Sequence, residues 1–232
     1  MSSLVISMIV FNVSAYLLIK LRSKLYHNKV FKPMITNIKL SVIPMFVILA
    51  GSGISIMILY TSIYFNNPMI RLVSIVFFVL TLLVWILLLP NSGYLVTELN
   101  LTHRSMDEHE VPILYDIVSV FVLSFSGILN MLMGIFIIQL IYLIYFDPAV
   151  ITFYMKQLLI LMALAICFLV SVGIYLGREV RFNSWDVLHP FKFIVKIFKH
   201  LRKPGEFKNS LLFILLHTIF FMLMYYTIAP KW

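Results

Sequence analysis

The chain has 232 residues, of which 62% are hydrophobic and 12% are charged, and its mean hydropathy is +1.03. Soluble domains carry about 45–50% apolar and about 25% charged residues, so this chain could not cover a water-facing surface. Its net charge of +9 is therefore interpreted first as a membrane signal, and nucleic acid is disfavoured as a partner. A single cysteine, Cys167, excludes an intramolecular disulfide and a cysteine-based zinc cluster.

Six stretches are apolar and long enough to cross a bilayer, which takes about 20 residues of helix. The run from Ile113 to Phe146 predicts one long helix, because a turn at Ser126-Gly127 would leave two spans that are too short. No sizeable soluble domain, linker or internal repeat is recognisable, so residues 1–232 are predicted to form one all-α membrane domain. The spans are expected at about 3–19, 40–61, 72–89, 114–142, 157–177 and 209–229.

The basic residues separate between the two sides of this six-span arrangement. Segments 20–39, 90–112 and 178–208 lie on one side and carry all but three of the 18 Lys and Arg residues. The positive-inside rule therefore places these segments in the cytoplasm and both termini outside. The three remaining cations are Arg71, Lys156 and Lys231.

A short basic segment lies between Pro190 and Pro204. Its apolar residues recur at helical spacing and its lysines recur on another face, which predicts an amphipathic helix over 191–203. Such a helix lies in the headgroup plane of the membrane. There each cation adds about 1 kcal/mol of attraction to anionic lipid. Two interpretations stay open, a connector at the membrane surface and a specific site for an anionic lipid or lipid-linked substrate. The lipid-facing cations are predicted to be Lys192, Lys196, Lys199 and Lys203.

Polar residues gather after the third predicted span, in what we call the first polar segment (residues 90–116). Pro-Asn-Ser-Gly, which begins at Pro90, predicts a turn. Tyr94, Thr97 and Glu98 follow it at a spacing that puts them on one face if the segment is helical. An aspartate at the start of the fourth span suits the positive end of the helix dipole. The candidate site residues here are Asn91, Tyr94, Thr97, Glu98, Tyr115 and Asp116.

The fifth predicted span ends in a second polar segment (residues 175–186), which opens on the same side of the membrane. Arg178 and Arg181 are three residues apart, so both can point in one direction as helical neighbours. We therefore expect the two polar segments to converge, with the arginines contacting Glu98, Asp116 or both. The candidate site residues of the second segment are Tyr175, Arg178, Arg181, Asn183 and Asp186.

Three motifs carry a family resemblance. They are Pro-Asn-x-x-Tyr-Leu-Val-Thr-Glu-Leu from Pro90, Pro-x-x-Tyr-Asp from Pro112, and Gly-x-Tyr-Leu-Gly-Arg-x-x-Arg-x-Asn-Ser-Trp-Asp from Gly173. Over about residues 70–230 the chain resembles a family of bacterial multi-pass membrane proteins known only as a domain of unknown function. The resemblance implies a multi-pass protein of the bacterial cytoplasmic membrane and no established activity. This chain has Leu114 where family members often carry Trp.

Three functions stay open for the polar segments. In an enzyme, Glu98, Asp116 or His103 would act as acid or base while the arginines hold a phosphate- or carboxylate-bearing lipid. In a lipid-binding or lipid-translocating protein, the segments would form a headgroup site or gate. In a structural or assembly component, they would be a salt-bridge network that fixes helix ends. No cofactor is predicted, and no metal site, because the spacing of His103 and Asp107 matches no recognised ligand pattern.

One ionisable residue, His217, lies near the middle of a predicted span. Ionisable side chains at this depth are costly unless they are neutral or paired. We expect His217 to be neutral and bonded to a neighbouring helix, with Asn130 as its partner.

Overall fold

The computed structural model describes residues 2–101, 103–104, 107, 109–146, 152–180 and 190–228. Among these residues the regular elements are helical, and six helices are long and apolar enough to cross a membrane. The predicted all-α, six-span architecture is therefore confirmed. The elements are α1 (Ser2–Tyr26), α2 (Lys32–Tyr64), α3 (Pro68–Leu88), α4 (Pro90–Gly93), the 3₁₀ helix η1 (Tyr94–Asn100), α5 (Ile113–Phe146), α6 (Phe153–Arg178), α7 (Pro190–Leu201) and α8 (Glu206–Ile228).

The long helices extend beyond the apolar stretches that predicted them. α1 continues to Tyr26, seven residues past the expected end at 19, and α2 begins at Lys32 instead of 40. Charged residues mark where a helix leaves hydrocarbon, but its i to i−4 hydrogen bonds continue into the interface. The run from Ile113 to Phe146 forms one unbroken helix, as predicted.

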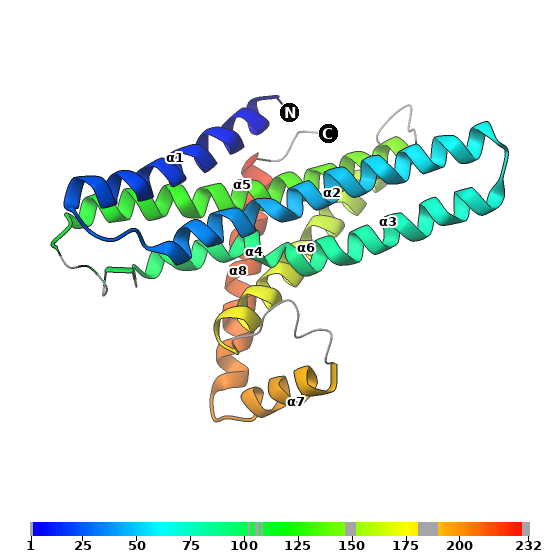
Figure 1. The fold of residues 1–232 in the computed structure, drawn as a ribbon. Helices are drawn as coiled ribbons and strands as arrows, with labels where there is room; N and C mark the ends of the chain where they lie inside the picture. The colour runs from blue at the N-terminus through cyan, green and yellow to red at the C-terminus, as the bar shows by residue number, and fades with distance from the viewer. Residues whose placement is uncertain are drawn as a thin grey trace.

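Figure 1 shows two groups of helices. α1, α2, α3 and α5 form a layer, with the α1–α2 connection and the start of α5 at one end and the α2–α3 turn at the other. α6 and α8 run in opposite directions as a packed pair that crosses this layer, and α7 lies where α6 ends and α8 begins. The two ends rich in basic residues are therefore the α1–α2 end of the layer and the α7 end of the pair.

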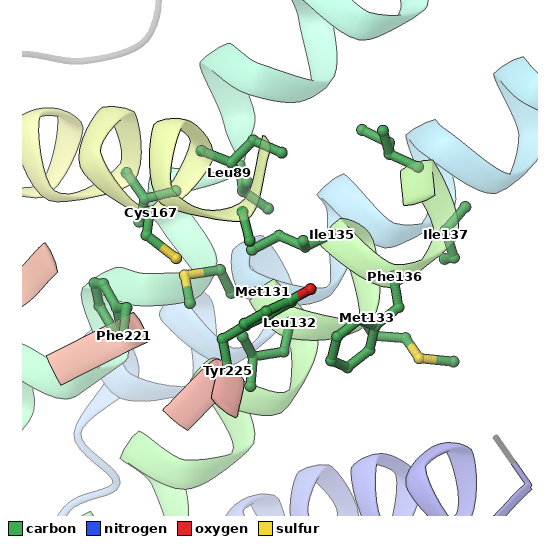
Figure 2. Packing of buried hydrophobic residues seen from close by; sticks show 14 of the residues in the cluster. Leu89, Met131, Leu132, Met133, Ile135, Phe136, Ile137, Cys167, Phe221 and Tyr225 are labelled. Atoms are coloured by element: carbon green, nitrogen blue, oxygen red, sulfur yellow. The ribbon is translucent and has the colours of Figure 1, made fainter. Parts of the chain in front are cut away.

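The core is built around α5. In its most apolar stretch 83% of the residues are buried, against 39% or less in every other candidate span. Figure 2 shows α5 side chains such as Met131 and Phe136 among Cys167 of α6 and Phe221 of α8. The buried position of α5 also brings its polar side chains, such as Asn130 and Gln139, into hydrogen bonds with other helices.

Close backbone contact fixes the end of the third span beside α6. A Cβ atom at Gly173 of α6 would overlap the ring of Pro90, and one at Gly93 would crowd Val170 and Ile174. Small residues permit such an approach between membrane helices. The contact brings the beginning of the first polar segment next to the last two turns of α6.

Buried amides join the helices of the layer. Asn130 of α5 donates to Asn12 of α1 at 3.1 Å and to the Ser41 hydroxyl of α2 at 2.9 Å. The predicted bond between Asn130 and His217 is therefore wrong. His217 Nδ1 lies 2.9 Å from the Phe213 carbonyl oxygen of its own helix, and its ring stacks on Phe213. A carbonyl one turn earlier satisfies this histidine without a partner helix.

Candidate functional site

Asp116 is the most completely paired of the predicted site residues. It lies in the first turn of α5 and is fully buried. Arg22 Nε donates to Oδ1 at 2.6 Å and Arg22 Nη2 to Oδ2 at 3.1 Å, while Arg104 Nη1 also donates to Oδ2. Two guanidinium groups from different parts of the chain therefore neutralise one buried carboxylate.

Arg22 also binds a second carboxylate. Its Nη1 and Nη2 atoms donate to the two oxygens of Asp107 at 2.9 and 2.6 Å, in the bidentate geometry that suits a planar guanidinium. The side chain ties the last turns of α1 to the start of α5 and to the connection between η1 and α5. We call the group Arg22, His103, Arg104, Asp107 and Asp116 the Arg22 cluster.

Neighbouring contacts hold the same connection in place. The side chain of Asn28, in the α1–α2 connection, donates to the His109 carbonyl oxygen and accepts from the His109 N–H, both at 2.8 Å. Tyr115 donates its hydroxyl to the Leu18 carbonyl oxygen at 2.8 Å. His109 is thus held against the α1–α2 connection, and the first turn of α5 is held against α1.

His103 completes the Arg22 cluster. It is 2% exposed, and its Nε2 lies 3.6 Å from Asp116 Oδ1. Its Nδ1 is buried and has no hydrogen-bond partner. Burial, helped by the positive charge of Arg22, lowers the pKa of His103 below its ordinary value, although Asp116 opposes this shift. The imidazole is therefore neutral at pH 7.

A small, partly enclosed pocket lies beside the cluster, between α1, α2 and α5. It has room for about one water molecule. Its lining is partly polar and partly apolar. The polar residues that line it are Arg22, Ser23, Lys29, His103, Asp116 and Ser119, and the apolar ones are Ile19, Val30, Phe31, Met34, Val120 and Leu123.

The first polar segment meets α6 through its backbone. Arg178 Nη1 donates to the Thr97 carbonyl oxygen at 3.0 Å. Glu98 is buried, and it accepts from Asn37 Nδ2 of α2 at 2.9 Å. Asn91 and Tyr94 are half-buried nearby. The two polar segments do converge, but this contact joins an arginine to a carbonyl group and not to a carboxylate.

Tyr175, the first residue of the second polar segment, contacts α7. The Tyr175 hydroxyl lies 2.9 Å from His200 Nε2, and the same nitrogen lies 3.3 Å from Glu206. Arg178 is the last residue of α6, and its Nε lies 3.7 Å from the neighbouring Glu179. Arg181, Asn183 and Asp186 lie outside the residues that the structure describes.

The predicted pairing of Arg178 with Asp116 is corrected by this geometry, because Arg22 and Arg104 occupy the carboxylate. Sequence reasoning missed Arg22 as a partner. A signal was present, since Arg22 is the one arginine among the lysines of segment 20–39. Arginine is the usual cation of buried ion pairs, because its fork matches a carboxylate and it is weakly hydrated.

The segment between the two prolines forms α7, and its described side chains are largely exposed. Phe191 is 85% exposed and Phe198 61%, and Lys192 and Lys199 are exposed on the same short helix. The exposed surface of α7 therefore carries both apolar and basic side chains. That this surface meets a membrane stays a prediction.

The described residues contain no group of three or more His, Cys, Asp or Glu side chains arranged to hold a metal ion. The sequence profile of a family described as Protein of unknown function (DUF1361) matches residues 37–224. The chain belongs to this family. No curated protein and no solved structure matches the chain. In this DUF1361 protein, α1 and its Arg22 precede the matched residues, whereas Asp116, Arg104 and Arg178 lie within them.

Proposed function

We propose that this multi-pass membrane protein binds an anionic lipid or lipid-linked substrate at the α7 end of the α6–α8 pair. The observation that carries the proposal is the surface of α7. Phe191 and Phe198 stand exposed beside lysines on a helix attached to two spans. Water disfavours such apolar exposure, whereas the headgroup region of an anionic bilayer accepts both kinds of side chain.

Contacts at the base of α7 support a fixed site. His200 holds the end of α7 against Tyr175 of α6 and Glu206 of α8. Arg178 lies less than one turn beyond Tyr175, and its side chain is 30% exposed. Its hydrogen bond to the Thr97 carbonyl oxygen orients the guanidinium. An oriented, partly exposed arginine beside a basic helix suits a phosphate or carboxylate headgroup.

We infer that the membrane is the bacterial cytoplasmic membrane and that α7 lies on its cytoplasmic face. The three basic segments and the family resemblance support this assignment. The cytoplasmic leaflet also carries anionic lipids, which attract cations placed near its surface.

Binding is better supported than catalysis. A general acid or base must come within hydrogen-bond reach of the reacting group. Asp116 is fully buried and paired with two arginines, and Glu98 is buried and bonded to Asn37. The closed pairing of Asp116 favours a structural role for the Arg22 cluster, as an anchor for α1, and leaves the headgroup site to α7 and Arg178.

The proposal is tested by counting lipids retained on the detergent-solubilised protein by native mass spectrometry, with phosphatidylglycerol and phosphatidylcholine as competing probes. The double variant R178Q/K199Q removes two cations of the proposed site. It should weaken phosphatidylglycerol retention roughly 30-fold, from about 1 kcal/mol per cation, and leave phosphatidylcholine unchanged.

The matched control is R71Q/K156Q, which removes one arginine and one lysine outside the three basic segments. It should retain phosphatidylglycerol as the unmodified protein does. Equal losses in the two double variants would mean that net charge alone attracts lipid, and the proposed site would be wrong.

A further inference from the structure

One residue that lines the pocket beside the Arg22 cluster has a polar atom that no protein group satisfies. His103 lines the pocket, is 2% exposed, and has a buried Nδ1 without a hydrogen-bond partner. Buried polar atoms are nearly always hydrogen-bonded, because leaving one unpaired forfeits the hydrogen bonds that it makes with water in the unfolded chain. The pocket is lined by residues of α1, α2, α5 and the connections next to them, and none of α7, so it is a separate site. Figure 1 shows the α1–α2 connection and α7 at different ends of the molecule.

The surroundings decide which partner Nδ1 requires. Asp116 Oδ1 lies 3.6 Å from Nε2, and a carboxylate favours the tautomer that carries the ring proton on the nitrogen facing it. The neutral ring then presents a lone pair at Nδ1. The partner must therefore donate a hydrogen bond.

The charged residues of the lining indicate that the hydrogen-bond donor for His103 Nδ1 is uncharged. The Arg22 guanidinium already donates to both Asp107 and Asp116, so it offers little to an anion, and an anion would also meet the Asp116 carboxylate in the lining. A cationic ligand would meet Arg22 and Lys29 in the lining. An uncharged donor avoids both difficulties.

The apolar walls suit an alcohol. Val30 and Phe31 of the α1–α2 connection, Met34 of α2 and Leu123 of α5 line the pocket together with its polar residues. The space beside the polar groups accepts about one water-sized group. A single hydroxyl group fits this space, and the carbon chain of an amphiphile would have to extend out of the pocket, which is only partly enclosed.

We propose that the pocket is a binding site for one uncharged hydroxyl donor, whose O–H is accepted by His103 Nδ1. The donor is the hydroxyl of a lipid alcohol or a single water molecule. The site is independent of the headgroup site at α7, and its occupant differs in charge from an anionic lipid.

The test uses the full chain in detergent with ¹⁵N-labelled histidine, and follows the Nδ1 resonance of His103. H103Q assigns this resonance among the six histidines, and H109Q, which changes an exposed histidine of the same loop, is the matched control. The probes are 1-octanol and its isomer 1-methoxyheptane, which has the same atoms but no O–H donor.

A lipid alcohol as occupant predicts that 1-octanol moves the Nδ1 resonance toward the hydrogen-bonded position and that 1-methoxyheptane does not. Water as occupant predicts that Nδ1 is hydrogen-bonded before any probe is added and that it shows magnetisation exchange with water protons. Three results would overturn the proposal: a proton on Nδ1, an Nδ1 resonance that stays at the free position with both probes, or equal shifts with both.

Discussion

At the scale of single residues, Asp116 and Arg22 form an ion pair in which both partners are almost entirely removed from solvent. Desolvating two charges costs several kcal/mol per ion, and only close geometry and further hydrogen bonds offset it. Here Arg104 and Asp107 supply those further bonds. Removing one member leaves the others buried without a counter-charge.

Asp116→Asn should therefore destabilise the protein by about 3–5 kcal/mol. Asp107→Asn is the control, because its side chain is more exposed and its loss leaves the Asp116 contacts intact. Thermal unfolding in detergent should give the lowest Tm for Asp116→Asn. An unfolding temperature for Asp116→Asn at or above that of Asp107→Asn would contradict the assigned role of the buried pair.

His103 gives the stability a pH dependence. Its pKa is lowered in the folded protein, so between that pKa and the ordinary value of 6.5 the unfolded chain binds more protons. This contribution to stability is complete above about pH 6.5 and is lost as the pH falls through the folded pKa.

Acidification from about pH 7.5 to about pH 5.5 should lower the Tm of the unmodified protein more than that of His103→Gln, since glutamine does not titrate. His109→Gln, which replaces an exposed histidine, should follow the unmodified protein. Parallel pH profiles for the unmodified protein and His103→Gln would show that His103 is not a buried neutral imidazole.

The partners of single polar side chains are the feature that the sequence predicts least well. It selected Asp116 and Glu98 as polar residues at helix ends, but their partners, Arg22 and Asn37, lie 94 and 61 positions away. Such pairs are set by how α1 and α2 pack on α5, and side-chain spacing within one segment carries no information about them. For Arg22, residue type was the available signal.

At the scale of elements, α2 and α3 pack closely along a seam of small and hydroxyl-bearing residues. Ser55 and Ser74 each donate to the other's carbonyl oxygen, at 3.0 and 2.8 Å. A Cβ atom at Gly51 would overlap the side chain of Thr81, whereas one at Gly53 would meet nothing within 4 Å. Two glycines on the same helix therefore differ in the space around them.

This difference predicts opposite outcomes for two equal substitutions. Gly51→Ala should destabilise the protein by about 1–3 kcal/mol through overpacking. Gly53→Ala should be neutral or stabilising, because alanine restricts the unfolded chain more than glycine does. Thermal unfolding of the two variants provides the comparison. A lower Tm for Gly53→Ala than for Gly51→Ala would mean that α2 and α3 do not meet at Thr81.

Elements were the level at which the sequence predicted most. Apolar length alone located all six candidate spans, because a bilayer imposes a minimum length on any helix that crosses it. Helix ends were misplaced where polar residues continue the helix, as at Lys20 to Tyr26 of α1. For His217 the sequence shows only a histidine in the middle of an apolar run. That position does not distinguish a hydrogen bond to another helix from the bond to Phe213 in its own helix.

At the scale of the whole molecule, two helix groups carry the two basic ends. The α1–α2 connection lies at one end of the layer, and α7 lies at one end of the α6–α8 pair (Figure 1). Arg22 belongs to the last turns of α1, and Arg178 is the last residue of α6. We infer that both ends lie on the cytoplasmic side of a membrane that the chain crosses six times. The charge distribution supports this claim, because it leaves few cations on the other side.

The most direct measurement is the accessibility of single cysteines, introduced after Cys167→Ala, to a membrane-impermeant maleimide in sealed right-side-out vesicles. Lys24→Cys and Lys203→Cys report the two basic ends, and Met69→Cys and Tyr154→Cys report exposed positions at the other ends of the spans. The reagent should label Met69→Cys and Tyr154→Cys in intact vesicles, and Lys24→Cys and Lys203→Cys only after permeabilisation. Different accessibility of Lys24→Cys and Lys203→Cys, or protection of Met69→Cys in intact vesicles, would contradict the inference that both basic ends are cytoplasmic.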